Sequence, residues 1–291
     1  MIHLLFTALV ASAQPESAHV DSVEIVVRDL PAERRFYEHA LHFSDEGERP
    51  VAGGKSERLT LGGQHVDLIV YDRAGQSISA DARSNDRDFQ HVAVIVSDMN
   101  RAWAWVQRFP IHSVSAGPQL LPRWNPNAGG IAAVYFRDPE GHPLELLHFP
   151  PDKGAAQWHA ASPLFLGIDH TAIAVTNSTV STRFYEALGL TVKGHSNNYG
   201  IEQERLSGVK GAHVAITAVR FESAPGVEFL QYLNPPAPQP PEREAVYDLG
   251  ATRTLIITPK SASLCASLHP IVQMYGNCIV RDPDGHLVEI R

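Results

Sequence analysis

Residues 137–146 read RDPEGHPLEL, and residues 281–290 read RDPDGHLVEI. In each copy an Asp-Pro pair and a glycine, which favour a tight turn, precede a short strand that carries one glutamate. A second motif, RFYE, occurs at residues 35–38 and again at residues 183–186. Both motifs recur at almost the same spacing, so the two halves of the chain are nearly in register. The sequence therefore contains an internal duplication.

Length and composition describe a globular protein. The chain has 291 residues, enough for two domains, and is 44% hydrophobic and 19% charged. The net charge of −8 and the lack of any basic cluster argue against nucleic acid as a partner. Cys265 and Cys278 are too few for a disulfide framework, and neither belongs to a CxxC motif.

The N-terminus resembles a signal for export. Residues 2–10 form a short apolar run, and Ala-Ser-Ala at residues 11–13 has the small-x-small pattern of a signal-peptidase site. We therefore expect residues 1–19 to be a signal peptide with a short lead, and the mature protein to be periplasmic or secreted. A cytoplasmic location is the alternative. We expect no membrane insertion after cleavage, because no later apolar run approaches about 20 residues.

The spacing of apolar residues divides the chain into four similar units, each with the order β-α-β-β-β. In the first unit we expect a strand at 23–27, a helix at 31–41 and strands at 58–61 and 65–71, and in the second a strand at 91–96, a helix at 99–109 and a hairpin at 132–149. In the third we expect a strand at 169–175, a helix at 179–190 and strands at 211–221 and 226–233. In the fourth we expect a strand at 252–258, a helix at 262–268 and a hairpin at 277–290. We place units one and two in a domain at 20–149, a linker at 150–165, and units three and four in a domain at 166–291.

Four such units, with FYE on a helix and DPxGHxxE at a closing hairpin, resemble the vicinal oxygen chelate superfamily. That superfamily includes glyoxalase I, extradiol dioxygenases, fosfomycin-resistance proteins and bleomycin-binding proteins. The resemblance covers residues 20–291. It implies an α+β fold with four βαβββ modules in two tandem glyoxalase-like domains, each an incomplete mixed β-barrel flanked by helices.

The resemblance also implies a divalent metal held by a histidine near the start of the first strand and a glutamate on the last strand of paired units. Zinc, nickel, manganese or iron would suit such ligands. When the four units are superposed on their shared motifs, the matching pairs are Ser22/Asp67, His91/Glu145, His170/Glu228 and Arg253/Glu289. Units two and three thus keep the His/Glu pair, whereas units one and four have lost the histidine.

The sequence allows two ways of pairing the units. Sequential pairing would give the sets Asp67, His91, Glu145 and His170, Glu228, Glu289, each with one histidine. Pairing of units two and three would instead give one complete site of His91, Glu145, His170 and Glu228, which we favour. Against this preference, the FYE motif occurs in units one and three and the DPxGH motif in units two and four. This alternation favours sequential pairing, so the sequence leaves the question open.

Two polar stretches are candidates for contact with a small-molecule substrate. Residues 195–211 are predicted to lie beside the proposed site, and residues 117–130 form a long loop that could cover it. The candidate substrate-binding residues in these stretches are Tyr199, Glu202, Gln203, Arg205 and Trp124.

The favoured function is a metal-dependent lyase or isomerase similar to glyoxalase I, acting on a small oxygen-chelating substrate. Glu145 or Glu228 would be the catalytic base. One alternative is an extradiol dioxygenase that cleaves a catechol. Another is a metal-free protein that binds a drug or an aromatic compound and confers resistance. The chain is expected to be a monomer or a homodimer.

Overall fold

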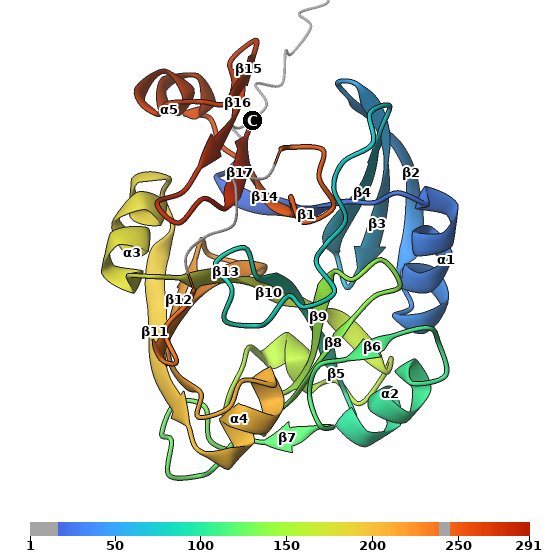
Figure 1. The fold of residues 1–291 in the computed structure, drawn as a ribbon, viewed down its shortest axis with the longest axis vertical. Helices are drawn as coiled ribbons and strands as arrows, with labels where there is room; N and C mark the ends of the chain where they lie inside the picture. Colours follow the sequence, from blue (N-terminus) through green and yellow to red (C-terminus); the bar gives the residue numbers. More distant parts are fainter. Residues whose placement is uncertain (1–16, 239–244) are drawn as a thin grey trace, which may run out of the picture.

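The computed structural model describes residues 17–238 and 245–291, and its architecture is two mixed sheets with short helices on their outer faces (Figure 1). The predicted α+β class with four βαβββ modules is confirmed. Most of the predicted signal peptide, residues 1–16, lies outside the described residues. In the part that is described, no helix is long and apolar enough to cross a membrane.

Each unit begins with a strand and a helix and continues with further strands. Unit one contains β1 (His19–Val26), α1 (Leu30–Ala40), β2 (Ser44–Val51), β3 (Gly54–Leu61) and β4 (Gln64–Tyr71). Unit two contains β5 (Gln90–Val96), α2 (Met99–Val106), β6 (His112–Ser113), β7 (Gln119–Leu120), β8 (Ala132–Arg137) and β9 (Pro143–His148). Unit three contains β10 (Phe165–Val175), α3 (Ser178–Ala187), β11 (Thr191–Tyr199), α4 (Ile201–Ser207), β12 (His213–Arg220) and β13 (Gly226–Asn234). Unit four contains β14 (Arg253–Ile257), α5 (Ser261–Ser267), β15 (Val272–Met274), β16 (Asn277–Arg281) and β17 (Leu287–Ile290).

The first helix of units one, two and three begins at a polar cap. The side chains of Asp29, Asp98 and Asn177 accept hydrogen bonds from the free backbone N–H groups of α1, α2 and α3. These caps end the preceding strands at equivalent points. The units therefore share the register that the sequence motifs indicate.

The sheets join units that are not consecutive along the chain. One sheet has the order β15-β16-β17-β14-β1-β4-β3-β2 and combines units one and four. The other has the order β11-β12-β13-β10-β5-β9-β8-β6, with β7 beside β8, and combines units two and three. The central contacts are antiparallel, β1 against β14 and β10 against β5. The structure therefore has the second of the two pairings that the sequence allowed.

The apolar cores follow the chain order instead. One core lies between units one and two and includes side chains of both α1 and α2, such as Tyr37 and Trp103. Another lies between units three and four and includes Tyr185 of α3 and Cys265 of α5. In Figure 1, α1 and α2 accordingly lie on one side of the molecule, and α3 and α5 on the other. Each predicted domain thus has an apolar core, while both sheets cross from one half to the other; the boundaries at 149 and 166 stay a prediction.

Strand β5 shows how one strand serves both arrangements. All of its residues are buried, in agreement with the apolar run at residues 92–96. Val92, Val94 and Val96 face the core between units one and two. The alternate residues, including His91 and Ile95, face the concave side that units two and three share.

The repeated RDPxGH turns connect the two sheets. Asp138 Oδ1 accepts hydrogen bonds from the backbone N–H groups of Glu140, Gly141 and His142. His142 Nδ1 lies 2.7 Å from Asp138 Oδ2, and its Nε2 lies 2.9 Å from the carbonyl oxygen of Val26, in β1 of the other sheet. The turn of unit two is thereby attached to the first strand of unit one.

The second copy makes the equivalent connection. Asp282 Oδ1 accepts from the N–H groups of Asp284, Gly285 and His286, and His286 Nε2 lies 2.8 Å from the carbonyl oxygen of Ala174 in β10. In unit one, Tyr37 of the FYE motif also reaches Asp138, with 3.4 Å between its hydroxyl and Oδ2. The alternation of FYE and DPxGH between units therefore reflects contacts between the sheets, and it says nothing about strand pairing.

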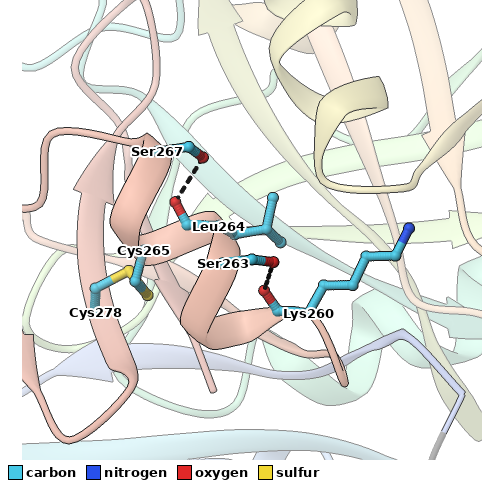
Figure 2. Close-up of a disulfide and its surroundings, with 6 residues drawn as sticks. All are labelled: Lys260, Ser263, Leu264, Cys265, Ser267 and Cys278. Atoms are coloured by element: carbon cyan, nitrogen blue, oxygen red, sulfur yellow. Dashed lines mark hydrogen bonds between the residues drawn. A yellow bond between two sulfur atoms is a disulfide. The ribbon is translucent and has the colours of Figure 1, made fainter.

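Cys265 of α5 and Cys278 of β16 form a disulfide (Figure 2). The sequence predicted no disulfide framework, and this single bond only attaches a short helix to its neighbouring strand. Disulfides persist in oxidising compartments, to which a signal peptide would lead. The location of the protein itself stays a prediction.

Replacing the turn carboxylate should destabilise the fold. Asp138→Ala removes the acceptor of three backbone N–H groups, one buried and two partly buried, and of the His142 side chain, so we expect a loss of about 3 kcal/mol in the free energy of unfolding. Chemical denaturation measures this loss. Asp152→Ala, at an exposed aspartate, is the matched control and should change little. Equal denaturation midpoints for the two variants would contradict the role of the turn.

The same turn should make stability depend on pH. Burial alone would lower the pKa of His142, but Asp138 and the Val26 carbonyl outweigh it and raise this pKa above 6.5. Because the folded-state pKa is raised, the contribution of His142 is fully present below about pH 6.5 and is lost as the pH rises through the folded-state value. The stability difference between wild type and His142→Asn, followed by denaturation from pH 6 to 9, should therefore shrink. A difference that stays constant or grows would contradict a charged His142.

Candidate metal centre

Three side chains of metal-ligand type converge on the concave face of the sheet formed by units two and three. His91 of β5, Glu145 of β9 and His170 of β10 are all buried, and one ligand atom from each lies within 4.8 Å of the others. Glu145 Oε2 is 3.1 Å from His91 Nε2 and 3.5 Å from His170 Nε2. This group could hold a metal ion.

Strand register explains the convergence. Ala93 is paired with His170 on one side and with Glu145 on the other, so these two ligands flank one small residue. His91 is two residues before Ala93 on the same strand and therefore faces the same side. Neighbouring strands lie about 4.8 Å apart, which brings side chains of adjacent rows into contact.

Glu228 of β13 lies at the edge of this group. Its Oε2 is 3.5 Å from His170 Nε2, and its side chain is 24% exposed, compared with 5% for Glu145. It is not one of the three tightly grouped residues. The structure thus brings all four predicted ligands to one place, with Glu228 as the most accessible.

The two histidines fit a metal in different ways. His91 is buried, its Nδ1 has no hydrogen-bond partner within the described residues, and its Nε2 has only the contact with Glu145 Oε2, 3.1 Å away. A buried polar atom without a partner is costly unless another group, such as a metal ion, satisfies it. His170 Nδ1 is 3.0 Å from Asp169 Oδ2, which leaves its Nε2 directed at Glu145 and Glu228. Two imidazoles and two carboxylates suit a divalent metal of intermediate softness.

The charges of the group are strongly coupled. Burial would raise the pKa of Glu145, but the two histidines lower it below its usual range. Burial would lower the pKa of His170, but Glu228, Asp169 and Glu145 together raise it well above 6.5. Burial raises the pKa of Glu228. Since metal ligands must be deprotonated, a metal and a proton would compete for His170.

Asp169 is a residue of the candidate site that the sequence reasoning missed. Its Oδ2 accepts from Arg220 Nη2 at 2.9 Å and faces His170 Nδ1, while its Oδ1 accepts from Trp158 Nε1 at 2.8 Å. Burial would raise the pKa of Asp169, but His170 and Arg220 hold it well below its usual range. Asp169 therefore fixes the orientation of a candidate metal ligand. The Asp-His dipeptide was the available signal, but Arg220 is distant in sequence.

A cavity of about 420 Å³ opens over the group, and Glu145, His170 and Glu228 belong to its lining. The volume suits a small molecule. Space exists there because the residues beside Glu228 in its sheet row are small: Ala218 pairs with Glu228, and Gly194 pairs with Ala218. The apolar part of the wall includes Leu121, Ile131, Leu147, Phe149 and Ile216.

The predicted substrate-binding residues have different positions relative to this cavity. Gln203 of α4 is buried and lines it. Trp124 and Tyr199 are about half exposed and stack on each other, with ring centroids 4.4 Å apart. Glu202 is half-buried and Arg205 is exposed, and neither is among the lining residues of this cavity. These positions do not test contact with a substrate, so the assignments stay predictions.

The equivalent place in the other sheet is occupied by an arginine. Ser22 pairs with Leu255 as His170 pairs with Ala93, which makes Arg253 the counterpart of His91, as the sequence register predicted. Arg253 is 1% exposed, and its Nε is 2.5 Å from Glu24 Oε2 and 3.3 Å from Glu289 Oε2. A fixed cation thus lies among the carboxylates, where the other sheet has room for a metal.

Residues 19–146 match the family model described as Glyoxalase/Bleomycin resistance protein/Dioxygenase superfamily. These residues belong to that superfamily, and the family predicted from the repeated motifs is confirmed. No curated protein matches the sequence.

Solved structures extend the likeness in fold to nearly the whole chain. Glyoxalase I from Zea mays has a TM-score of 0.63 at 15% identity, over 94% of this chain and 92% of that one. A putative dioxygenase from Bacillus subtilis subsp. subtilis str. 168 has a TM-score of 0.60 at 12% identity, over 95% of this chain and 86% of that one. At these identities the likeness concerns the tandem fold and not the activity.

Removing Arg253 should destabilise its sheet. Arg253→Leu leaves Glu24 and Glu289 buried with fewer cationic partners, so we expect a loss of about 4 kcal/mol in the free energy of unfolding, measured by chemical denaturation. Arg49→Gln, at an exposed arginine of the same sheet, is the control. A variant with leucine at position 253 that unfolds at the control's midpoint would show that the buried ion pairs do not hold this sheet together.

Proposed function

We propose that the chain is a divalent-metal-dependent enzyme, a lyase or isomerase similar to glyoxalase I, whose small substrate presents two neighbouring oxygens. The observation that carries this proposal is the convergence of His91, Glu145 and His170 beside a cavity, where the buried His91 has no partner for Nδ1 within the described residues and only Glu145 for Nε2. Zinc, nickel, manganese and iron are the candidate metals.

The residues have distinct roles in this proposal. His91, Glu145 and His170 would hold the metal, with Glu228 as a fourth ligand. The metal when bound would polarise a substrate carbonyl and favour loss of a neighbouring proton. Glu228 takes that proton as the general base, because it is the most exposed carboxylate of the group and faces the cavity. Asp169 and Arg220 keep His170 in place. The apolar wall limits the access of water to the reacting atoms.

An extradiol dioxygenase is the second candidate. The tight group contains two histidines and one carboxylate, the ligand set of many non-haem iron oxygenases. Glu228 discriminates between the two candidates, since it is a fourth ligand and base in the first and is not needed for iron in the second. The third possibility, a metal-free binding protein, gives His91 and His170 no ligand role.

Metal analysis of purified protein and of single variants tests the proposal. We expect about one equivalent of zinc, nickel or manganese in the wild type, and a loss of at least tenfold in metal affinity for His91→Ala, His170→Ala and Glu145→Gln. Glu228→Gln should weaken metal binding and abolish removal of the substrate proton. His112→Ala, at an exposed histidine of β6, is the control and should keep the metal.

The outcomes separate the three functions. Iron that is retained in Glu228→Gln and lost in the other three variants would favour the dioxygenase. A wild-type protein that binds none of these metals when they are supplied would overturn both enzyme proposals and leave the binding protein.

A further inference from the structure

The lining of the cavity contains cations in addition to the carboxylates Glu145, Asp169 and Glu228. Lys153, Lys193 and Arg220 belong to its lining, in a chain whose net charge is −8. Lys153 lies in the segment after β9, Lys193 lies in β11, and Arg220 is the last residue of β12. The three carboxylates face His91, His170 or Arg220, whereas Lys193 has no ion pair within the described residues, so this side chain is available to a negatively charged ligand.

Arg220 is held at this wall by a gap in the neighbouring strand. A Cβ atom at Gly226 would lie 3.0 Å from Arg220 Nε, so the absence of a side chain lets the arginine pass over β13. It reaches Asp169 through Nη2 alone, at 2.9 Å. The guanidinium is therefore fixed in place, partly exposed to the cavity, and has donors that its contact with Asp169 does not use.

Lys193 stands at an irregular point of β11. The pairing of β11 with β12 shifts in register between Val192 and Gly194, so Lys193 occupies a bulge, which redirects a side chain. Lys193 is exposed and makes no ion pair within residues 17–238 and 245–291. Lys153 is more constrained, since its Nζ donates to the carbonyl oxygen of Pro126.

We propose that the substrate carries a carboxylate in addition to its metal-binding oxygens, and that Arg220 and Lys193 bind this carboxylate. The inference rests on the proposed metal-dependent function. Arg220 already holds one carboxylate, Asp169, at one edge, and its remaining donors match a second one. Lys193 adds a second cation to the lining of the same cavity. The substrate class is thus a small acid that has two neighbouring oxygens and an acidic group at its other end.

Two hydroxamates that differ in one group test this inference in zinc-loaded protein. Both N-hydroxysuccinamic acid and butanohydroxamic acid present neighbouring oxygens to a metal, but only the first carries a carboxylate, where the second has a methyl group. Calorimetric titration of the full chain should show about tenfold tighter binding of the acid, as expected for charge-assisted hydrogen bonds. The preference should fall to about one in Arg220→Gln, should fall severalfold in Lys193→Gln, and should be partly retained in Arg220→Lys. Lys55→Gln, at an exposed lysine of β3, should keep it fully.

The controls distinguish failure of this inference from failure of the proposed function. Zinc content is measured for each variant, because Arg220 also supports Asp169. If the wild type holds none of the candidate metals, or the metal-loaded protein does not bind butanohydroxamic acid, the metal-dependent function fails and the inference falls with it. If the wild type holds another of these metals instead of zinc, the same titrations use that metal. If zinc and butanohydroxamic acid bind but the acid binds no better, the carboxylate site alone is overturned. A preference that survives in both glutamine variants also overturns it.

Discussion

The antiparallel pairing of β5 with β10 is the constraint on which the candidate site depends. It places the first strands of units two and three side by side, and with them His91 and His170, although these residues belong to different halves of the sequence. The parallel neighbours of these strands, β9 and β13, then bring Glu145 and Glu228 to the same face. Without this one pairing, each half would contribute a histidine and a glutamate to separate places.

The same constraint acts in the other sheet with a different chemical result. There β1 and β14 pair in the equivalent register, but the residues at the ligand positions are Ser22 and Arg253. Asp67 is bound by Ser22 and by Arg58, while Glu289 is bound by Arg291 and faces Arg253. Buried carboxylates need a cation or hydrogen-bond donors. One sheet supplies that cation from its own side chains, and the other leaves room for one from solution.

Much of this could be predicted from the sequence because the chain repeats itself. Four units within one sequence can be superposed without any relative, and the ligand register obtained in this way agrees with the strand pairing. The pairing of units could not be deduced, because contacts such as Tyr37 with Asp138 link motifs across the two sheets and imitate pairing along the chain. The link between Asp169 and Arg220 was also out of reach, since it depends on an arginine that passes over Gly226.

The crossed arrangement of sheets and cores also determines which parts of the molecule pack against the candidate site. Apolar cores hold units together in chain order, whereas hydrogen-bonded sheets hold them together across that order. One face of β5 packs in the core with unit one, and its other face carries His91 toward unit three. The same core contains Leu144 and Leu146, on either side of Glu145, and Ile168 of β10, so three central strands of the site pack against unit one. The candidate ligands therefore lie on central strands of the sheet, whereas the cations that line the cavity come from a strand end, a bulge and a connecting segment.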